Sequence, residues 1–183
     1  MSRWMVMVIA MMFPLVLDSA RTAASRSLWS RRHRALAWFL LGYLGPWMIF
    51  GGAACLLVGF AQTRGWYSTS MAASAGFGMA LAWQFTAWKR LGLHSCHRTQ
   101  PLAPRGWPAD RDCFLYGWAV SRGCLLSCWA LMLACLLAGH GLAVMVCTSA
   151  VCATERYFAR PEERALCGAV SMGALSYAAL CVL

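Results

Sequence analysis

Four cysteines recur at helical spacing within the apolar segment 113–138. An α-helix turns about 100° per residue, so Cys124, Cys128 and Cys135 fall within about 60° of Cys113 on one face. Cys124 and Cys128, one turn apart, would present two sulfurs to a single ion, and thiolates favour soft ions such as Cu(I) or Zn(II). A stripe of small residues at a helix contact gives the same pattern, and packing is its commoner origin.

Methionines supply a second set of soft donors near the N-terminus. Met7 and Met11 lie one turn apart on the same side of a predicted helix, whereas Met12 lies on roughly the opposite side. Thioethers bind Cu(I) and few other available ions. Methionine also fills irregular apolar space, which is its more frequent use.

A short cluster in the longest polar connection adds nitrogen donors. His94, Cys96 and His97 lie within four residues of one another. These ligand types suit zinc or copper, although a second pair at zinc-finger spacing is missing. We predict Cys96 and His97 as a cytoplasmic entry or delivery point for metal.

Three ionisable residues fall inside apolar segments: Asp18, Arg122 and Glu155. Charges at membrane depth are costly, so they are usually paired or face water. We expect Arg122 to pair with Asp18 or Glu155 and to fix helix packing. The two carboxylates are also possible hard ligands at the inner mouth of a metal site.

The elements that must position these residues follow from the distribution of positive charge. Most of the sixteen Lys and Arg residues lie in every second connection between apolar segments. Short basic loops stay on the cytoplasmic side of a membrane. The pattern therefore predicts an all-α polytopic bundle in a single domain, 1–183, with both termini outside. The six predicted spans are 4–20, 35–61, 66–88, 113–138, 142–158 and 165–183, and the cytoplasmic loops are 21–34, 89–112 and 159–164. The tight turn at 139–141 predicts an antiparallel hairpin of the fourth and fifth spans.

Composition limits the class of partner. The formal charge of +10 would suggest nucleic acid for a soluble chain, but 61% of the residues are hydrophobic. We therefore expect a lipid bilayer and no nucleic acid. The chain also lacks the phosphate-loop, nucleophile-elbow and zinc-protease motifs, and we expect no enzyme activity.

Several segments resemble one bacterial family. Val8–Pro14 is similar to its Ala-Met-Met-Leu-Pro signature, and Trp83–Thr86, with Lys89 and Cys96 further on, resembles its Tyr-Gln-x-x-Pro-Leu-Lys…Cys segment. Gly123–Met132 resembles its Cys-Cys-Trp-x-Leu-Met motif, with Ser127 where a second adjacent Cys is usual, and Glu155 stands where the family has a Glu. The family is that of predicted metal-binding integral membrane proteins of bacteria.

The resemblance implies a protein of the bacterial cytoplasmic membrane that binds a soft metal ion. The expected ion is copper, with zinc as the alternative. The predicted ligands are Cys124, Cys128, Met11, Met12, Cys96 and His97, with Met12 included only because the resembled signature contains it. The expected role is a chaperone or assembly factor for a cuproenzyme. The alternative is a non-catalytic accessory subunit of a larger membrane complex, in which Cys and Met serve only packing.

Overall fold

The computed structural model describes residues 2–66, 68–95, 100–103, 105–139, 141–157 and 173–174. Within these residues the secondary structure is helical and contains no strand. The elements are α1 (Ser2–Ser25), η1 (Trp29–Arg31), α2 (Arg32–Thr63), α3 (Thr69–Gln84), α4 (Ala87–Ser95), α5 (Gly106–Leu137) and α6 (Leu142–Tyr157). The all-α class predicted from the sequence is therefore confirmed for this part of the chain.

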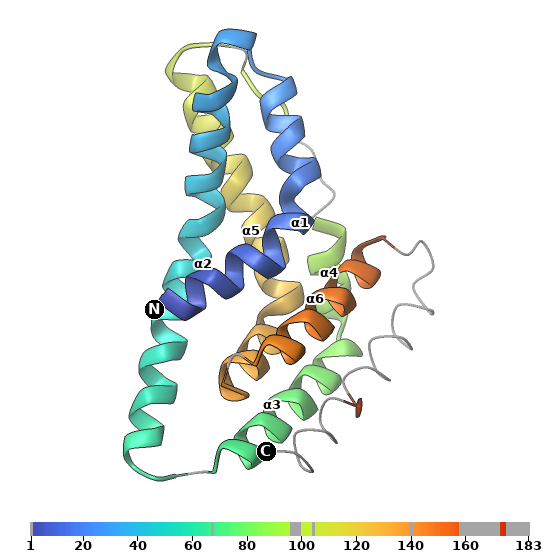
Figure 1. Cartoon of the computed structure of the whole chain (residues 1–183). Helices are drawn as coiled ribbons and strands as arrows, with labels where there is room; N and C mark the ends of the chain where they lie inside the picture. Colours follow the sequence, from blue (N-terminus) through green and yellow to red (C-terminus); the bar gives the residue numbers. More distant parts are fainter. Residues whose placement is uncertain are drawn as a thin grey trace.

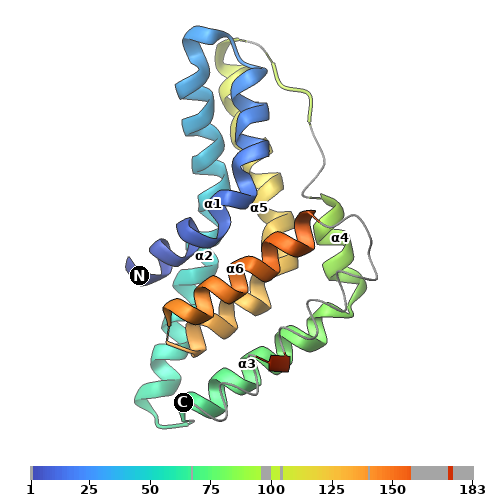
Figure 2. The same ribbon diagram turned by 45° about the vertical axis from the view of Figure 1, so that its right-hand side comes forward.

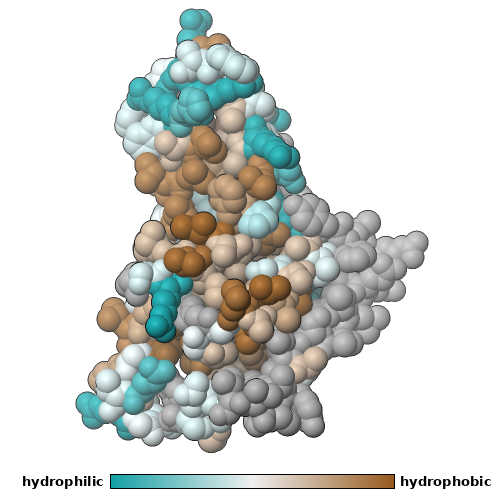
Figure 3. Space-filling model, in the orientation of Figure 1, coloured by the Kyte–Doolittle hydropathy of each residue, from teal (hydrophilic) through white to brown (hydrophobic). Residues whose placement is uncertain are grey.

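The two longest helices, α2 and α5, run side by side along the molecule, and the other helices pack around them (Figures 1 and 2). Three of the described helical segments are long and apolar enough to cross a membrane: Ser2–Ser25, Trp29–Thr63 and Gly106–Leu137. In Figure 3, hydrophilic residues gather at the end where α1 joins α2, hydrophobic residues cover much of the middle of this face, and further hydrophilic residues lie at the lower end. On the face shown, an apolar middle therefore lies between two more polar ends.

Two glycines allow α2 and α5 to approach closely. A Cβ added at Gly42 would overlap the carbonyl oxygen of Phe114, and one at Gly117 would overlap the carbonyl oxygen of Phe39. The two helices therefore touch backbone to backbone, as small residues permit in membrane bundles. At the polar end, the buried carboxylate of Asp110 on α5 accepts from two arginines beside it, at 2.7 Å each (Arg31 and Arg34).

Helix α1 changes direction about half-way along its length (Figures 1 and 2). Pro14 lies inside this helix, where it removes one backbone hydrogen bond and favours a bend. The N-terminal half is held against α2, because Trp4 Nε1 donates to the carbonyl oxygen of Trp47 at 3.1 Å. Three methionines that precede Pro14 are buried in the bundle: Met7, Met11 and Met12.

Small residues also bring α3 and α4 close to α5. A Cβ at Gly76 would lie 3.0 Å from the Cα of Ala134, and one at Gly92 would lie 3.0 Å from the carbonyl oxygen of Gly123. Lys89, assigned from the sequence to the start of a cytoplasmic loop, is buried in the first turn of α4. The predicted last span and third loop lie outside the described residues apart from 173–174.

Candidate metal centre

The cysteine stripe of α5 faces the interior of the protein. Cys113, Cys124, Cys128 and Cys135 are all buried, with exposed fractions of 7% or less. Helix α6 returns antiparallel beside α5 (Figure 1). The chain reverses at Gly139, whose φ of +74° favours glycine because it lacks a Cβ. The thiols of Cys124, Cys128 and Cys135 therefore meet side chains of α6.

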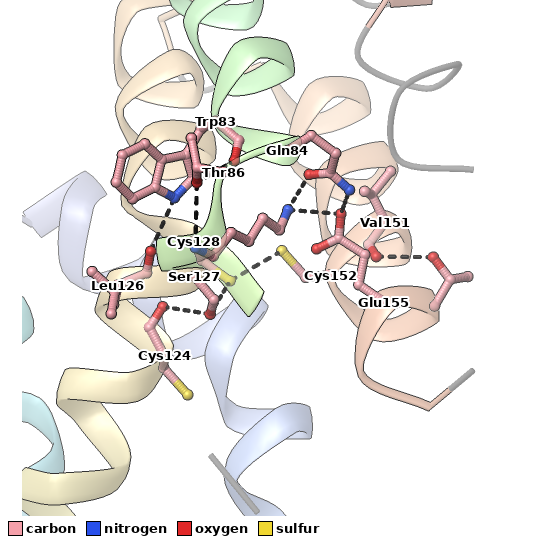
Figure 4. A network of polar contacts seen from close by, with 12 residues as sticks. Trp83, Gln84, Thr86, Cys124, Leu126, Ser127, Cys128, Val151, Cys152 and Glu155 are labelled. Carbon is pink, nitrogen blue, oxygen red and sulfur yellow. Dashed lines mark hydrogen bonds and ion pairs between the residues drawn. The ribbon is translucent and has the colours of Figure 1, made fainter. Parts of the chain in front are cut away.

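Cys128 meets a cysteine of α6. The Cys152 thiol donates toward the Cys128 sulfur with the two sulfur atoms 3.8 Å apart, and Figure 4 shows both side chains pointing toward each other. The Ser127 hydroxyl lies 3.3 Å from the Cys128 sulfur and donates to the Cys124 carbonyl oxygen at 3.0 Å. Each thiol thus has a fixed position on a different helix.

Cys124 has a cationic neighbour. The Arg156 guanidinium donates an N–H to the Cys124 sulfur at 3.8 Å. Only 8% of Arg156 is exposed, so its charge is largely removed from water. Arg156 lies one helical turn beyond Cys152 on α6, as Cys124 lies one turn before Cys128 on α5. The Cys128–Cys152 pair and the Cys124–Arg156 pair therefore lie on successive turns of the two antiparallel helices.

A buried polar network stands beside the thiol pair (Figure 4). Lys89 Nζ lies 2.8 Å from Glu155 Oε1 on α6, and both side chains also hydrogen-bond to the Gln84 amide. Thr86 Oγ1 accepts from the Lys89 backbone N–H at 3.3 Å, which caps α4. Trp83 Nε1 donates to the Leu126 carbonyl oxygen at 3.0 Å and holds the end of α3 on α5. These contacts place an ammonium and a carboxylate next to the cysteines.

The thiols and charges share one small cavity of about 10 Å³. Its lining includes three cysteines and two charged groups, completed by three further side chains: Cys124, Cys128, Cys152, Glu155, Arg156, Leu15, Leu93 and Ser127. A volume of this size is close to that of a single water-sized probe. The space therefore suits one ion and excludes a larger ligand.

A second group of sulfur atoms lies two turns further along α5. The Cys135 sulfur is 3.3 Å from the Thr148 hydroxyl of α6, and that hydroxyl is 4.0 Å from the Met11 sulfur of α1. The same hydroxyl also lies 2.7 Å from the Val144 carbonyl oxygen, its acceptor within the helix. The sulfur atoms of Met11 and Cys135 therefore both contact the Thr148 hydroxyl. This group joins three helices.

Of the six ligands predicted from the sequence, four lie in the described part of the chain. Cys124, Cys128, Met11 and Met12 are all buried. Cys96 and His97 lie outside the described residues. The structure brings Cys128 to Cys152 instead of pairing its sulfur with that of Cys124, its neighbour on the helix.

The expected ion pairs of Arg122 are wrong. Glu155 pairs with Lys89 at 2.8 Å, and Asp18 lies 3.9 Å from Arg21 on its own helix. Arg122 is exposed, on the side of α5 away from the cysteines. The reason is geometric: α4 packs against the bundle and places the Lys89 ammonium beside the Glu155 carboxylate, while Arg122 points away from it.

The sequence contains a pattern from which Cys152 and Arg156 could have been predicted as the partners of Cys128 and Cys124. Cys128 and Cys152 lie equally far from position 140, and so do Cys124 and Arg156. In two antiparallel helices, residues equidistant from a tight turn lie at the same height. Combined with the predicted turn at 139–141, this symmetry indicates both pairs.

The donor set fits a soft ion with few ligands. Among the residues that the structure describes, no group of three or more His, Cys, Asp or Glu side chains is arranged to hold a metal ion. Two sulfur atoms that each lie about 2.3 Å from one ion are about 3.8–4.0 Å apart at tetrahedral or trigonal angles. The Cys128–Cys152 separation of 3.8 Å matches these bent angles, at which an ion takes a third donor, and Cys124 lines the same cavity. A linear ion with two thiolates would hold the sulfur atoms about 4.6 Å apart.

Fold and site together define a helical protein with a buried pair of thiol donors. A family model described as PpoB2, copper chaperone, matches residues 1–181, and the chain belongs to this family. No curated protein and no solved structure matches the chain. Membership confirms that the resemblance is to a metal-related family, supports a copper-handling role and suggests a non-catalytic one.

Proposed function

We propose that this protein is an integral membrane copper chaperone that carries Cu(I) between Cys128 and Cys152 and passes it to a cuproenzyme. The observation that carries the proposal is the 3.8 Å contact between two buried thiols from different helices. Thiolates favour soft ions, Cu(I) and Zn(II) among them, and Cu(I) is stable with as few as two or three thiolate ligands. The family description, which names copper, supports the same ion.

In this proposal the neighbouring donor side chains have weaker or transient roles in binding the ion. Cys124 lines the same cavity and is a reserve ligand for arrival or departure of the ion. Met11 and Cys135 form a second, weaker station, because their sulfur atoms flank one Thr148 hydroxyl. Met12 stays a candidate from the resembled signature, and Cys96 with His97 a candidate delivery point.

We propose a cytoplasmic-membrane location with the arginine-rich end facing the cytoplasm. Three helices have the length and apolar character to span a bilayer. The loops predicted at 21–34 and 89–112 also contact each other, because Arg26 donates to the Gln100 carbonyl oxygen at 3.0 Å and Arg31 to that of Gly106 at 3.1 Å. Loops on one side of a membrane meet in this way, and the positive-inside rule assigns the side.

The test is a Cu(I) titration of the detergent-solubilised protein under anaerobic conditions, in competition with a chromophoric Cu(I) chelator. We expect Cys128→Ser and Cys152→Ser each to lower the Cu(I) affinity at least about a hundredfold, since each leaves a single thiolate. Cys147→Ser is the matched control, because Cys147 lies on α6 but is exposed.

Equal Cu(I) affinity in the wild type, both variants and the control would refute the proposal. That result would favour the accessory-subunit role, in which the cysteines only pack. Release to a partner is a separate question, and the same variants can be scored by copper loading of a co-expressed cuproenzyme.

A further inference from the structure

Arg156 is a buried cationic side chain beside the thiols. It is largely buried, and among the described residues no carboxylate lies within ion-pair distance of its guanidinium. A buried charge without a counter-charge is costly at membrane depth. Its polar contact is with the Cys124 sulfur, and it lines the cavity that Cys128 and Cys152 also line. Among the described residues, the groups beside Arg156 that become anionic when they bind a metal are the thiols of this cavity.

The other charges in the site already cancel. Lys89 and Glu155 form an ion pair at 2.8 Å, and both are almost fully buried. Within the described part of the chain, Arg156 then adds one positive charge beside the cavity that no carboxylate balances. Two thiolates with a monovalent ion have a net charge of minus one, which Arg156 brings to zero. Two thiolates with a divalent ion are already neutral, so Arg156 would stay unbalanced.

We propose that Arg156 is the counter-cation of the metal-loaded thiol pair and that it favours Cu(I) over divalent ions at this site. The inference rests on the proposed function, because it takes Cys128 and Cys152 as the ligands. Arg156 acts through its charge and touches the Cys124 sulfur. Arg156 and the two ligand thiols line the same cavity, and Coulomb attraction across such a largely desolvated site is strong enough to change affinity by an order of magnitude or more.

The experiment measures Cu(I) and Zn(II) affinities side by side, each against a chromophoric chelator, for purified full-length protein under anaerobic conditions. We expect Arg156→Met to lower the Cu(I) affinity at least about tenfold and to leave the Zn(II) affinity unchanged or higher. Arg156→Lys keeps the charge and should stay within about threefold of the wild type. Arg122→Met removes an exposed charge from the other side of α5 and should change neither affinity.

A double variant separates charge from structure. In Glu155→Gln/Arg156→Met, Lys89 loses its counter-charge and becomes the single uncompensated cation of the site. We expect it to recover most of the Cu(I) affinity that Arg156→Met loses. Circular dichroism checks that each variant is folded, and Arg156→Gln replaces Arg156→Met if the latter does not fold.

Parallel loss of both metals in Arg156→Met, or no recovery in the double variant, would overturn the inference while leaving the thiol site in place. An unchanged Cu(I) affinity in Arg156→Met would overturn it as well. Failure of the proposed function has a different signature, because Cys128→Ser and Cys152→Ser would then bind Cu(I) as the wild type does.

Discussion

Lys89 and Glu155 carry opposite charges that the surrounding helices remove from water. Their 2.8 Å contact and the hydrogen bonds of both to Gln84 compensate for the lost hydration. Glu155 lies within one turn of Cys152 on α6, so the ion pair also fixes the rotation of that helix. At this scale the thiol site depends on a charge pair that need not touch the metal.

Removing one member of the pair should therefore destabilise the protein. We expect Lys89→Met to lower the free energy of unfolding by about 3–5 kcal/mol, because Glu155 stays buried without a counter-charge. Arg90→Met, at the exposed neighbouring position, is the control. Reversible unfolding in mixed detergent measures the difference, and Lys89→Met/Glu155→Gln should recover part of it. Equal stability of Lys89→Met and Arg90→Met would contradict the role of the pair.

At the scale of elements, α2 and α5 form the support on which the other helices rest. Gly42 and Gly117 give each helix contact with the backbone of the other, and Asp110 joins them again at the polar end. Helix α6 is attached differently, through the buried side chains around Cys152 and Thr148. The α2–α5 pair is therefore closely packed near the first cysteine of α5, whereas the second thiol of the site, that of Cys152, lies on α6.

The glycine contact gives a prediction with an internal control. We expect Gly117→Ala to lower the free energy of unfolding by about 1–3 kcal/mol, because its methyl group would overlap the Phe39 carbonyl oxygen. Gly59→Ala changes a helical glycine of α2 whose Cβ would meet nothing within 4 Å, and it should be neutral or stabilising. The same unfolding assay applies. A smaller loss for Gly117→Ala than for Gly59→Ala would show that the helices do not meet at this point.

Sequence patterns predicted the helical class, because long apolar stretches and helical spacing depend only on local residue order. They also placed the cysteines of α5 on one face, which the structure shows buried. The partners of those cysteines depend on how α6 and α4 fold back. Arg122 was given the wrong counter-charge since the position of Lys89 follows from the turn at Thr86, which local periodicity does not show.

At the scale of the whole molecule, hydrophilic residues gather at the end where α1 joins α2 and again at the lower end, and the middle of the same face is largely apolar (Figure 3). At the first of these ends, Arg26 contacts Gln100 in the loop before α5, and Arg31 contacts Gly106 and Asp110 at the start of α5. The turn between α2 and α3 lies at the far end of α2 (Figure 1). A membrane placed across the apolar part separates these two ends.

Cysteine accessibility in intact cells tests this orientation. We expect Ser68→Cys, before α3, to react with a membrane-impermeant maleimide above the wild-type level. Ser30→Cys, in the exposed turn before α2, should react only after the cells are opened. The wild type gives the background from the native cysteines. The reverse pattern would place the basic end outside and contradict the proposed topology.

Because its two thiols come from different helices, the proposed site ties the cargo to the integrity of the fold. A ligand that binds only the folded chain adds a stability that grows with its free concentration, about 2.7 kcal/mol at one hundred times the dissociation constant. The cell's supply of copper would then set how long α5 and α6 stay together. A partner protein that takes the ion away would leave the chaperone less stable and more readily degraded.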